Sequence, residues 1–577
     1  MAKIWKQKEI PAAAVLAEYE AVTPLVATLL WQRGVTASET KHFLEIDYAD
    51  QYDPYAFLSM RVAVDRIWKA IESGERIVIY SDYDADAVTA NAVLTQTFRY
   101  LGVDIGSYIP DRFTEGYGLN IEAFEKIQAD GAQVVITVDC GTNSVDVAEW
   151  CKKQGIDLII TDHHEITGEV PTPYALINPK NPTEQYPDHQ ITGVGVAYKL
   201  AKALLDEKAK VVKLKGISEE QYVANWDKWL LDLVAIGTVA DCHSLLGENR
   251  IFVKYGLKVL ARTKWAGLRA ILGLAVKDAA SELTTYTLGF LLAPRINAAG
   301  RLEHANIALD TLLARDPVVA GQAALVLDKV NTRRQELTSR LISEAREQAQ
   351  LQGERKVLVL AGTDWPKGIV GIAAGRLATE FMKPVIVLEA ATDMCTGSAR
   401  TWGEFDVVAA LQATSEYLVK YGGHKEAAGL SLLPENLEAF RIAIARYAET
   451  AAGFESEKGI DVDAVLGVED LTLDCFDQLE RLAPFGAGNP KPVFLLRGAV
   501  LQQARKVGKE STHVQVVFDV GGVPLAGIGF SMAHIADMFP LETRCDVVVE
   551  LMADAWNGVR KLKCRVIDIR LAETEVH

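Results

Sequence analysis

Several features that define large classes of protein are missing from this sequence of 577 residues. Its seven cysteines never form a C-x-x-C pair, which argues against a disulfide framework or a cysteine zinc site. No apolar run approaches the roughly 20 residues that a membrane-spanning helix needs, and the first residues lack the apolar core of a secretory signal. We therefore expect a cytoplasmic protein without a membrane partner.

Positive charge is also scarce, since 60 Lys and Arg face 77 Asp and Glu, for a formal net charge of −17. This balance speaks against a protein that coats nucleic acid through a globally basic surface, although it leaves room for a local basic groove. The hydrophobic share of 49% and the aromatic share of 8% are typical of a globular protein. The length exceeds one hydrophobic core and predicts about three folding units.

Short β-branched runs alternate with amphipathic helical stretches between residues 76 and 162. The runs at 76–82, 132–139 and 157–162 each end in an acid. Such alternation predicts β-α-β units with a parallel sheet. The acids then lie at the carboxyl ends of the strands, where open α/β sheets bind their ligands.

The rest of the chain divides into recognisable parts. A long, charged, amphipathic stretch at 317–352 predicts a helix that connects two domains, or else one more helix of the first domain. A second α/β pattern spans 356–432, and five short alternating segments at 493–571 predict an OB-fold barrel. The predicted divisions are a helical segment at 1–50, a parallel-sheet α/β domain at 51–315, the connecting helix at 316–353, a smaller α/β domain at 354–455 and the barrel at 456–577.

Four groups of acids follow apolar runs. They are Asp82, Asp84 and Asp86 in "SDYDADA", Asp139, Asp162 with His163 and His164 in "TDHHE", and Asp241. If the chain stays extended past residue 81, the alternate spacing of the first group points all three carboxylates the same way. Like charges this close are costly unless a cation neutralises them. Taken alone, the first group would be a solvated turn and the histidines a hydrogen-bonded pair; together the four groups predict one site.

Carboxylate oxygens mixed with one or two imidazoles suit Mn²⁺ or Mg²⁺ better than structural zinc. Several bridging acids would support two ions about 3.5–4 Å apart, the arrangement used for in-line attack on phosphorus. One histidine of "TDHHE" would then bind metal. Its neighbour would contact the phosphoryl group or act as an acid.

The motifs resemble a known superfamily. "DYDAD", "VDCGT", "TDHHE" and "GTVAD", in this order, are similar to the four motifs of the DHH phosphoesterases, and "GGHKEAAG" resembles the signature of their associated second domain. "YIPDRFTEGYGLN", "APRINAAGR", "GSAR" followed by "FDVVAAL", and "APFGAGNPKPVF" resemble segments of the RecJ family. The resemblance covers the chain from about residue 50 onward.

The resemblance implies a two-metal exonuclease, specific for single-stranded DNA, that works 5′→3′, releases 5′-mononucleotides and serves DNA recombination and repair. It implies a DHH domain and a DHH-associated domain joined by the long helix, followed by the OB-fold. A monomer is expected, with a helicase and a single-strand-binding protein as candidate partners. The implied metal ligands are Asp82, Asp84, Asp86, Asp139, His163 and Asp241, and the implied catalytic residues are His164 and Asp139. The implied contacts to DNA and phosphate are Arg112, Arg295, Arg301, Ser398, Arg400, Gly422, Gly423 and His424.

The chain departs from the family pattern at four positions. Ser81 and Ala87 replace glycines, which would cost roughly 1 kcal/mol if either position required a positive φ. His243 follows Asp241 where the family usually has aliphatics and a proline, and it could act as a partner of a ligand or as an adventitious ligand itself. Pro366 stands where a histidine is common. These departures bear on rate and metal preference.

Two rival functions remain open at this point. A DHH phosphodiesterase for very short RNAs or cyclic dinucleotides would usually be shorter and lack the barrel. A catalytically silent scaffold that binds single strands would have lost metal ligands, and here none is lost. The basic runs at 505–509 and 560–565 offer local positive charge for a strand, with solvated turns as the alternative.

Overall fold

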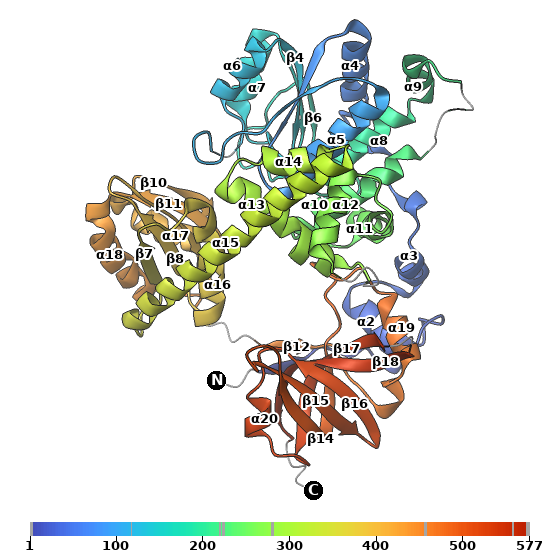
Figure 1. Cartoon of the computed structure of the whole chain (residues 1–577), viewed down its shortest axis with the longest axis vertical. Coiled ribbons are helices and arrows are strands. Elements are labelled where there is room, and N and C mark those ends of the chain that lie inside the picture. Colours follow the sequence, from blue (N-terminus) through green and yellow to red (C-terminus); the bar gives the residue numbers. More distant parts are fainter. Residues whose placement is uncertain are drawn as a thin grey trace. The chain divides into compact units, whose positions relative to one another are not determined.

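The computed structural model describes residues 4–116, 118–218, 221, 225–277, 282–454, 459–556 and 559–572. The chain forms two compact units (Figure 1). One unit contains the N-terminal segment that ends at Gln51, the stretch Ser244–Leu246 and the C-terminal barrel. The other contains Tyr52–His243 and the chain from Gly247 through the second α/β domain.

A five-stranded parallel sheet forms the first domain of the larger unit, in the order β3-β2-β4-β5-β6. Its strands are β2 (Arg76–Ser81), β3 (Gly106–Tyr108), β4 (Ala132–Val138), β5 (Asp157–Thr161) and β6 (Ala175–Ile177). The side chains of β2, β4 and β5 are almost all buried, as expected when helices cover both faces. Ser81 pairs with Val138, and Val138 pairs with Thr161. Residues 82, 139 and 162, which directly follow these strand ends, therefore lie side by side at one edge of the sheet.

Helices connect these strands and complete the domain. They are α4 (Met60–Ser73), α5 (Ala85–Leu101), α6 (Ile121–Ala129), α7 (Val145–Gln154), α8 (Gly193–Asp206), α10 (Leu231–Ala240), α11 (Gly247–Leu260), α12 (Ala266–Ala275), α13 (Ala293–Leu302) and α14 (Asn306–Leu313). The apolar run before Asp241 is the buried helix α10, which packs on α5 and α11, and not a strand. A short apolar run without periodicity cannot distinguish the two.

The predicted connecting helix is confirmed as α15 (Pro317–Gln352). Its first turn is capped by Asp316, whose carboxylate accepts hydrogen bonds from the backbone of Val318 at 2.9 Å and Val319 at 3.0 Å. The helix packs on α12, α13 and α14 and also on β7 and α16 (Figure 1). It therefore belongs to both α/β domains.

The second α/β domain is built on a mixed sheet in the order β10-β11-β9-β8-β7. Its elements are β7 (Leu358–Gly362), α16 (Lys367–Phe381), β8 (Val385–Ala390), β9 (Cys395–Arg400), α17 (Val407–Ala413), β10 (Lys420–His424), β11 (Ala427–Leu432) and α18 (Leu437–Thr450). The glycine-rich "YGGHKEAAGLSL" forms the β10–β11 hairpin at the edge of this sheet. Its strands β7 and β8 are parallel, as the β-α-β pattern predicts.

The predicted five-stranded barrel is also present. Its strands are β14 (Phe494–Val507), β15 (His513–Val520), β16 (Val523–Gly529), β17 (Arg544–Trp556) and β18 (Val559–Leu571). Their order β14-β15-β16-β18-β17 closes through pairing of β17 with β14. The basic runs at 505–509 and 560–565 lie on or next to β14 and β18. Several of their side chains form ion pairs, as Lys506 does with Asp537 and Arg560 with Asp477.

The N-terminal segment is part of the barrel unit. Strand β1 (Trp5–Gln7) pairs in parallel with β12 (Ile460–Val462), and this strand was not part of the predicted helical segment at 1–50. Leu29 and Leu30 of α2 (Pro24–Gln32) are fully buried in one cluster with apolar side chains of the barrel. The N-terminal segment therefore contributes to the core that stabilises the barrel.

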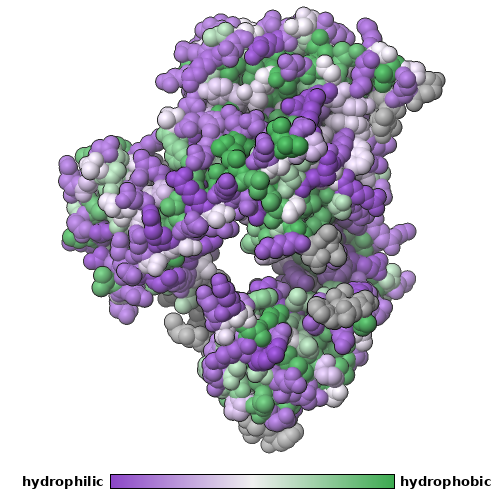
Figure 2. Space-filling view, in the orientation of Figure 1, coloured by the Kyte–Doolittle hydropathy of each residue, from purple (hydrophilic) through white to green (hydrophobic). Residues whose placement is uncertain are grey.

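No helix in the described ranges combines the length and the apolar character needed to cross a bilayer. On the face shown in Figure 2, hydrophobic residues form scattered groups among hydrophilic ones.

Replacement of Asp316 by Ala removes the cap of α15. We expect the free energy of unfolding of the larger unit to fall by about 1 kcal/mol, because two backbone N–H groups lose their acceptor. Urea denaturation followed by circular dichroism measures the change. Asp316→Asn should retain most of the stability, since Asn also caps helices, and Asp393→Ala, in an exposed turn between β8 and β9, serves as the matched control. Equal stability of Asp316→Ala and the control would contradict the role of the cap.

Candidate metal centre and phosphate pocket

The first group of acids lies where β2 passes into α5. Asp84 is the N-cap of α5, and its carboxylate accepts a hydrogen bond from the backbone of Ala87 at 3.0 Å. Asp86 lies in the first turn and is 1% exposed. Its two oxygens accept hydrogen bonds from the backbone of Gly193 and Val194, each at 2.9 Å. The chain thus turns into a helix after Asp82, so the extended alternation that the spacing predicted is wrong.

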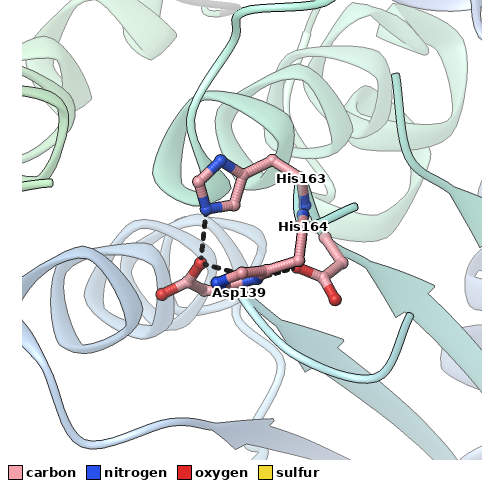
Figure 3. Close-up of side chains that lie close together, drawn as sticks. Asp139, His163 and His164 are labelled. Carbon is pink, nitrogen blue, oxygen red and sulfur yellow. Dashed lines mark hydrogen bonds and ion pairs between the residues drawn. The ribbon is translucent and has the colours of Figure 1, made fainter. Parts of the chain in front are cut away.

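Asp139 follows β4 in a left-handed conformation, with φ of 59°. Its backbone N–H donates to the carbonyl of Thr161 at 2.9 Å, which fixes this turn against β5. The Oδ1 atom lies 3.0 Å from Nε2 of His163 (Figure 3). A Cβ on Gly193 would lie 2.5 Å from the same oxygen, so only glycine leaves room for the Asp139 carboxylate.

His163 is buried, and three carboxylates surround its Nε2 atom. The distances are 3.0 Å to Oδ1 of Asp139, 3.6 Å to Oδ2 of Asp241 and 3.9 Å to Oδ2 of Asp86. Burial and repulsion from His164 lower the pKa of His163 to about 3. The ring is therefore neutral at physiological pH and offers a lone pair, as a metal ligand must.

Asp162 holds the two histidines in place. Its Oδ2 accepts a hydrogen bond from the backbone of Thr142 at 2.9 Å, and its Oδ1 accepts one from the backbone of His163 at 2.7 Å. The same Oδ1 lies 2.8 Å from Nδ1 of His164, which must donate because the ionised carboxylate can only accept. Burial acts to raise the pKa of Asp162, but the hydrogen bond and charge of His164 hold it below the usual range. The imidazole of the part-exposed His164 is thereby oriented by Asp162 through Nδ1.

Asp82, Asp86, Asp139 and Asp241 are destabilised as anions. Burial and repulsion from Asp84 raise the pKa of Asp82 to about 8 and that of Asp241 to about 7. Burial, followed by repulsion from neighbouring acids, also raises the pKa values of Asp86 and Asp139. Without a cation these groups would retain protons near neutral pH.

The donor set fits a divalent cation. Oδ1 of Asp82, Oδ1 of Asp139 and both ring nitrogens of His163 are buried without a hydrogen-bond partner. Neighbouring ligands of an octahedral ion at about 2.1 Å lie about 3.0 Å apart, and the separations around His163 start at 3.0 Å. Oxygen donors with one or two imidazoles suit Mn²⁺ and Mg²⁺. Asp139, Asp162, His163 and His164 bring one donor atom each within 4.8 Å of one another.

A group of arginines adjoins the acids. Arg301 on α13 is half-buried and donates from Nη1 to the carbonyl of Gly368 at 3.1 Å. Burial and repulsion from Arg112 lower its pKa to about 10, and Arg334 and Arg400 add further repulsion. Guanidinium groups that repel one another in a buried place are suited to an anion such as phosphate.

Further contacts position the side chains of this candidate phosphate pocket. Arg400 donates a hydrogen bond to Oγ of Ser398, and Gly371 of α16 leaves room for both side chains. The guanidinium of Arg112 stacks 4.7 Å above the ring of Tyr83. Arg334 on α15 was missed by the sequence analysis, since no motif contains it; its Nε atom is buried without a hydrogen-bond partner.

Four other residues that were predicted to contact phosphate are not part of this group of arginines. Arg295 donates from Nε to Asp328 of α15 at 2.8 Å and from Nη1 to the carbonyl of Leu291 at 2.5 Å. Gly422, Gly423 and His424 lie on the exposed strand β10. Gly423 has φ of 147°, and a Cβ there would lie 2.3 Å from the carbonyl oxygen of Ala427, so the hairpin requires glycine. Contact of these four residues with phosphate stays a prediction.

Three of the departures from the family motif, at Ser81, Ala87 and Pro366, have ordinary backbone conformations. Ser81 ends strand β2 and Ala87 lies in the first turn of α5, and neither has a positive φ. Oγ of Ser81 accepts a hydrogen bond from Asn91 at 3.0 Å. Pro366 is the N-cap of α16, with φ of −59°.

Three models of known protein families match parts of this chain. The "DHH family, N-terminal domain" matches residues 76–238, the "DHHA1 domain" matches 354–450 and the "RecJ OB domain" matches 462–568. The single-stranded-DNA-specific exonuclease RecJ of Bacillus subtilis is 38% identical over 566 residues, which are 97% of this chain and 70% of the relative. The chain belongs to the RecJ family.

Solved structures of RecJ support the same conclusion. The crystal structure of RecJ from Thermus thermophilus in complex with Mn²⁺ has a TM-score of 0.82 and 28% identity, and covers 99% of this chain and 80% of that one. The structure of the same protein in complex with Mg²⁺ has a TM-score of 0.76 and 28% identity, with 99% and 79% coverage. The oxygen and nitrogen donors described above are suited to either of these ions.

Replacement of Gly193 by Ala should weaken metal binding. The added Cβ would overlap the Asp139 carboxylate and displace it, so we expect the affinity for Mn²⁺ to fall roughly tenfold or more. Isothermal titration calorimetry measures this. Gly273→Ala is the matched control, because a Cβ on this exposed residue of α12 meets nothing within 4 Å. Unchanged affinity in Gly193→Ala would contradict the placement of Asp139 at the metal centre.

Proposed function

We propose that this member of the RecJ family is a metal-dependent exonuclease that degrades single-stranded DNA 5′→3′ and releases 5′-mononucleotides. The proposal depends on one observation, the buried cluster of acids and imidazoles next to the arginines of the candidate phosphate pocket. The acids supply a cation site and the arginines supply a site for a terminal phosphate. The same proposal assigns the protein to DNA recombination and repair in the cytoplasm, as a monomer that works with a helicase and a single-strand-binding protein.

The proposed metal ligands are Asp82, Asp84, Asp86, Asp139, His163 and Asp241, and we propose that they hold two ions. Divalent cations, when bound, supply positive charge that polarises phosphoryl oxygens and lowers the pKa of water. The chain's own contribution is to keep these donors fixed through Gly193, Val194 and Thr161. Preorganised donors of this kind cost no rearrangement during the reaction.

His164 is proposed to act on the scissile phosphate. Burial acts to lower its pKa, but the hydrogen bond and charge of Asp162 raise it above the usual value. A protonated ring stabilises negative charge on the phosphoryl group and can donate a proton from Nε2 to a leaving oxygen. Because Asp162 holds Nδ1, the ring keeps one orientation throughout.

The 5′-phosphate of the strand is proposed to bind in the candidate phosphate pocket. This pocket contains Arg112, Arg301, Ser398 and Arg400. A planar guanidinium can present two parallel N–H donors to phosphate oxygens. Binding of the terminus at a fixed place determines which phosphodiester meets the metal centre, which explains the release of mononucleotides.

The barrel favours a long polymer as substrate. OB-folds bind single strands by stacking bases on aromatic side chains in a basic groove. Phe530 is 52% exposed, and its ring lies 5.5 Å from that of His513 and 6.0 Å from the guanidinium of Arg565. This group offers a stacking surface. A phosphodiesterase for cyclic dinucleotides would not need this stacking surface, because its substrate has only two bases.

The decisive experiment compares three substrates in the presence of Mn²⁺. They are a 3′-labelled single strand, the same strand in a duplex and a cyclic dinucleotide. We expect mononucleotides from the single strand alone, and no product after addition of a chelator. Cleavage of the cyclic dinucleotide alone would favour the rival phosphodiesterase, while binding without cleavage would indicate a scaffold.

Replacement of Asp139 by Ala should abolish cleavage, because the residue contributes to the metal centre from the middle of the acid cluster. The far-UV circular dichroism spectrum should be unchanged. Asp146→Asn, on the exposed face of α7, removes the same charge outside the cluster and should cleave normally. Undiminished activity of Asp139→Ala would refute the metal assignment.

Replacement of Arg400 by Gln should weaken recognition of the 5′ terminus. We expect KM for a 5′-phosphorylated strand to rise roughly 10- to 100-fold, since a hydrogen bond to a charged group contributes about 1.5–3 kcal/mol. A strand with a 5′-hydroxyl should respond much less. Steady-state kinetics on both strands, with the exposed Arg355→Gln as control, separates these effects. An equal loss on both strands would place Arg400 outside the phosphate pocket.

A further inference from the structure

The turn after α10 brings an additional imidazole to the metal centre. Asp241 is the C-cap of α10, and Cys242 then adopts φ of 58°. This left-handed residue folds the chain back, so that Nε2 of His243 lies 3.3 Å from Oδ2 of Asp241. The rings of His243 and His163 have centroids 4.8 Å apart. His163, Asp241 and His243 thus bring one donor atom each within 4.8 Å of one another.

The opposite side of the His243 ring is held by the backbone. Nδ1 lies 3.1 Å from the carbonyl oxygen of Gln190. A carbonyl oxygen has no hydrogen, so Nδ1 must carry the proton and donate it. The same carbonyl accepts a second hydrogen bond from Asn249 at 2.6 Å, and the N–H of Gln190 donates to Asp188 at 2.9 Å. The acceptor is therefore fixed independently of the metal centre.

A neutral ring with its proton on Nδ1 has a lone pair on Nε2. That lone pair then faces a carboxylate oxygen of Asp241, which also carries lone pairs, at 3.3 Å. Such a contact is unfavourable unless a positive charge lies between the two atoms. Either a second proton on the ring or a metal ion supplies it. An imidazole that donates one N–H to a backbone carbonyl and presents the other nitrogen to a site is the usual arrangement of a metal-binding histidine.

The separations favour the metal ion. Nε2 of His163 lies 3.6 Å from Oδ2 of Asp241, and Nε2 of His243 lies 3.3 Å from it. Both distances are close to the edge of about 3.0 Å between neighbouring ligands of an octahedral ion. His163 in addition is buried and has no hydrogen-bond partner on either nitrogen. Two imidazoles can therefore bind one ion from either side of Asp241.

We propose that His243 is an additional nitrogen ligand of the metal centre, next to His163 and Asp241, and that it shifts the preference of the site from Mg²⁺ toward Mn²⁺. Imidazole nitrogen is a better ligand for Mn²⁺ than for the harder Mg²⁺, which prefers oxygen and retains its water. The inference rests on the metal centre of the proposed function, but not on the DNA substrate. A family member with an aliphatic residue at this position would lack this donor.

Calorimetric titration of the full chain with Mn²⁺ and, separately, with Mg²⁺ tests the proposal without DNA. His243→Ala should lower the affinity for Mn²⁺ roughly tenfold or more, and the affinity for Mg²⁺ by a clearly smaller factor. His243→Gln replaces the nitrogen donor by an amide oxygen and should also lose the preference for Mn²⁺. His534→Ala, an exposed histidine of the barrel unit, should bind both ions as the unchanged protein does. An equal fall for both ions would indicate a structural role and overturn the proposal.

Pulsed electron paramagnetic resonance of bound Mn²⁺ gives a second readout. Nitrogen coupling should correspond to two imidazoles in the unchanged protein and to one in His243→Gln, which retains the size and polarity that the turn needs. The same nitrogen coupling in both proteins would overturn the proposal. Failure to cleave single-stranded DNA, with the loss of coupling still observed, would contradict the proposed function and leave this inference standing.

Discussion

Buried carboxylates that repel one another meet at one edge of the parallel sheet of the DHH domain. The register of β2, β4 and β5 places Asp82, Asp139 and Asp162 side by side at one edge of the sheet. Burial penalises the negative charges of Asp82 and Asp139, and neighbouring acids add to the penalty. A bound divalent cation would offset this unfavourable electrostatic free energy. Binding of the cation and stability of this edge are therefore linked, since the cation binds the folded arrangement and not the unfolded chain.

Neutral groups around the acids maintain the arrangement. Gly193 allows the Asp139 carboxylate to lie against the first turn of α8. The backbone N–H groups of the same turn bind Asp86, where the partial positive charge of a helix N-terminus favours an anion. Asp162 differs from the other acids, because four hydrogen bonds from Thr142, His163 and His164 keep its charge stable. One acid thus orients the histidines while the others remain available to metal.

Much of the fold could be predicted from the sequence, because its signals are local. The strands of the parallel sheet are continuous β-branched runs, α15 has 36 residues of helical pattern, and the barrel strands alternate between Gly-containing turns. The elements that were missed depend on distant partners. Strand β1 has three residues and exists through its pairing with β12, more than 450 residues away. The run before Asp241 is apolar all round, so that only its burial between helices shows it to be a helix.

The site was predicted in its chemistry but not in its geometry. Motifs identify the donors by residue type, yet the direction of a side chain beyond a strand end depends on where the next helix begins. Asp86 therefore faces α8 in a way that the alternation of "DYDAD" did not indicate. Arg334 carries no motif, and its place beside Arg301 follows from the path of α15. Such contacts arise only once distant segments are packed together.

The length of α15 has a mechanical consequence. At 1.5 Å per residue, its 36 residues extend about 54 Å, and they support both α/β domains. A tilt of one degree at one end would displace the other by about 1 Å, which is enough to break a hydrogen bond. The arginines of the phosphate pocket belong to both domains, and Gly368 touches the backbone of Arg301 more closely than any larger residue could. This close contact limits relative movement of α13 and α16 near the middle of a long helix, and so limits how far the two groups of arginines can separate.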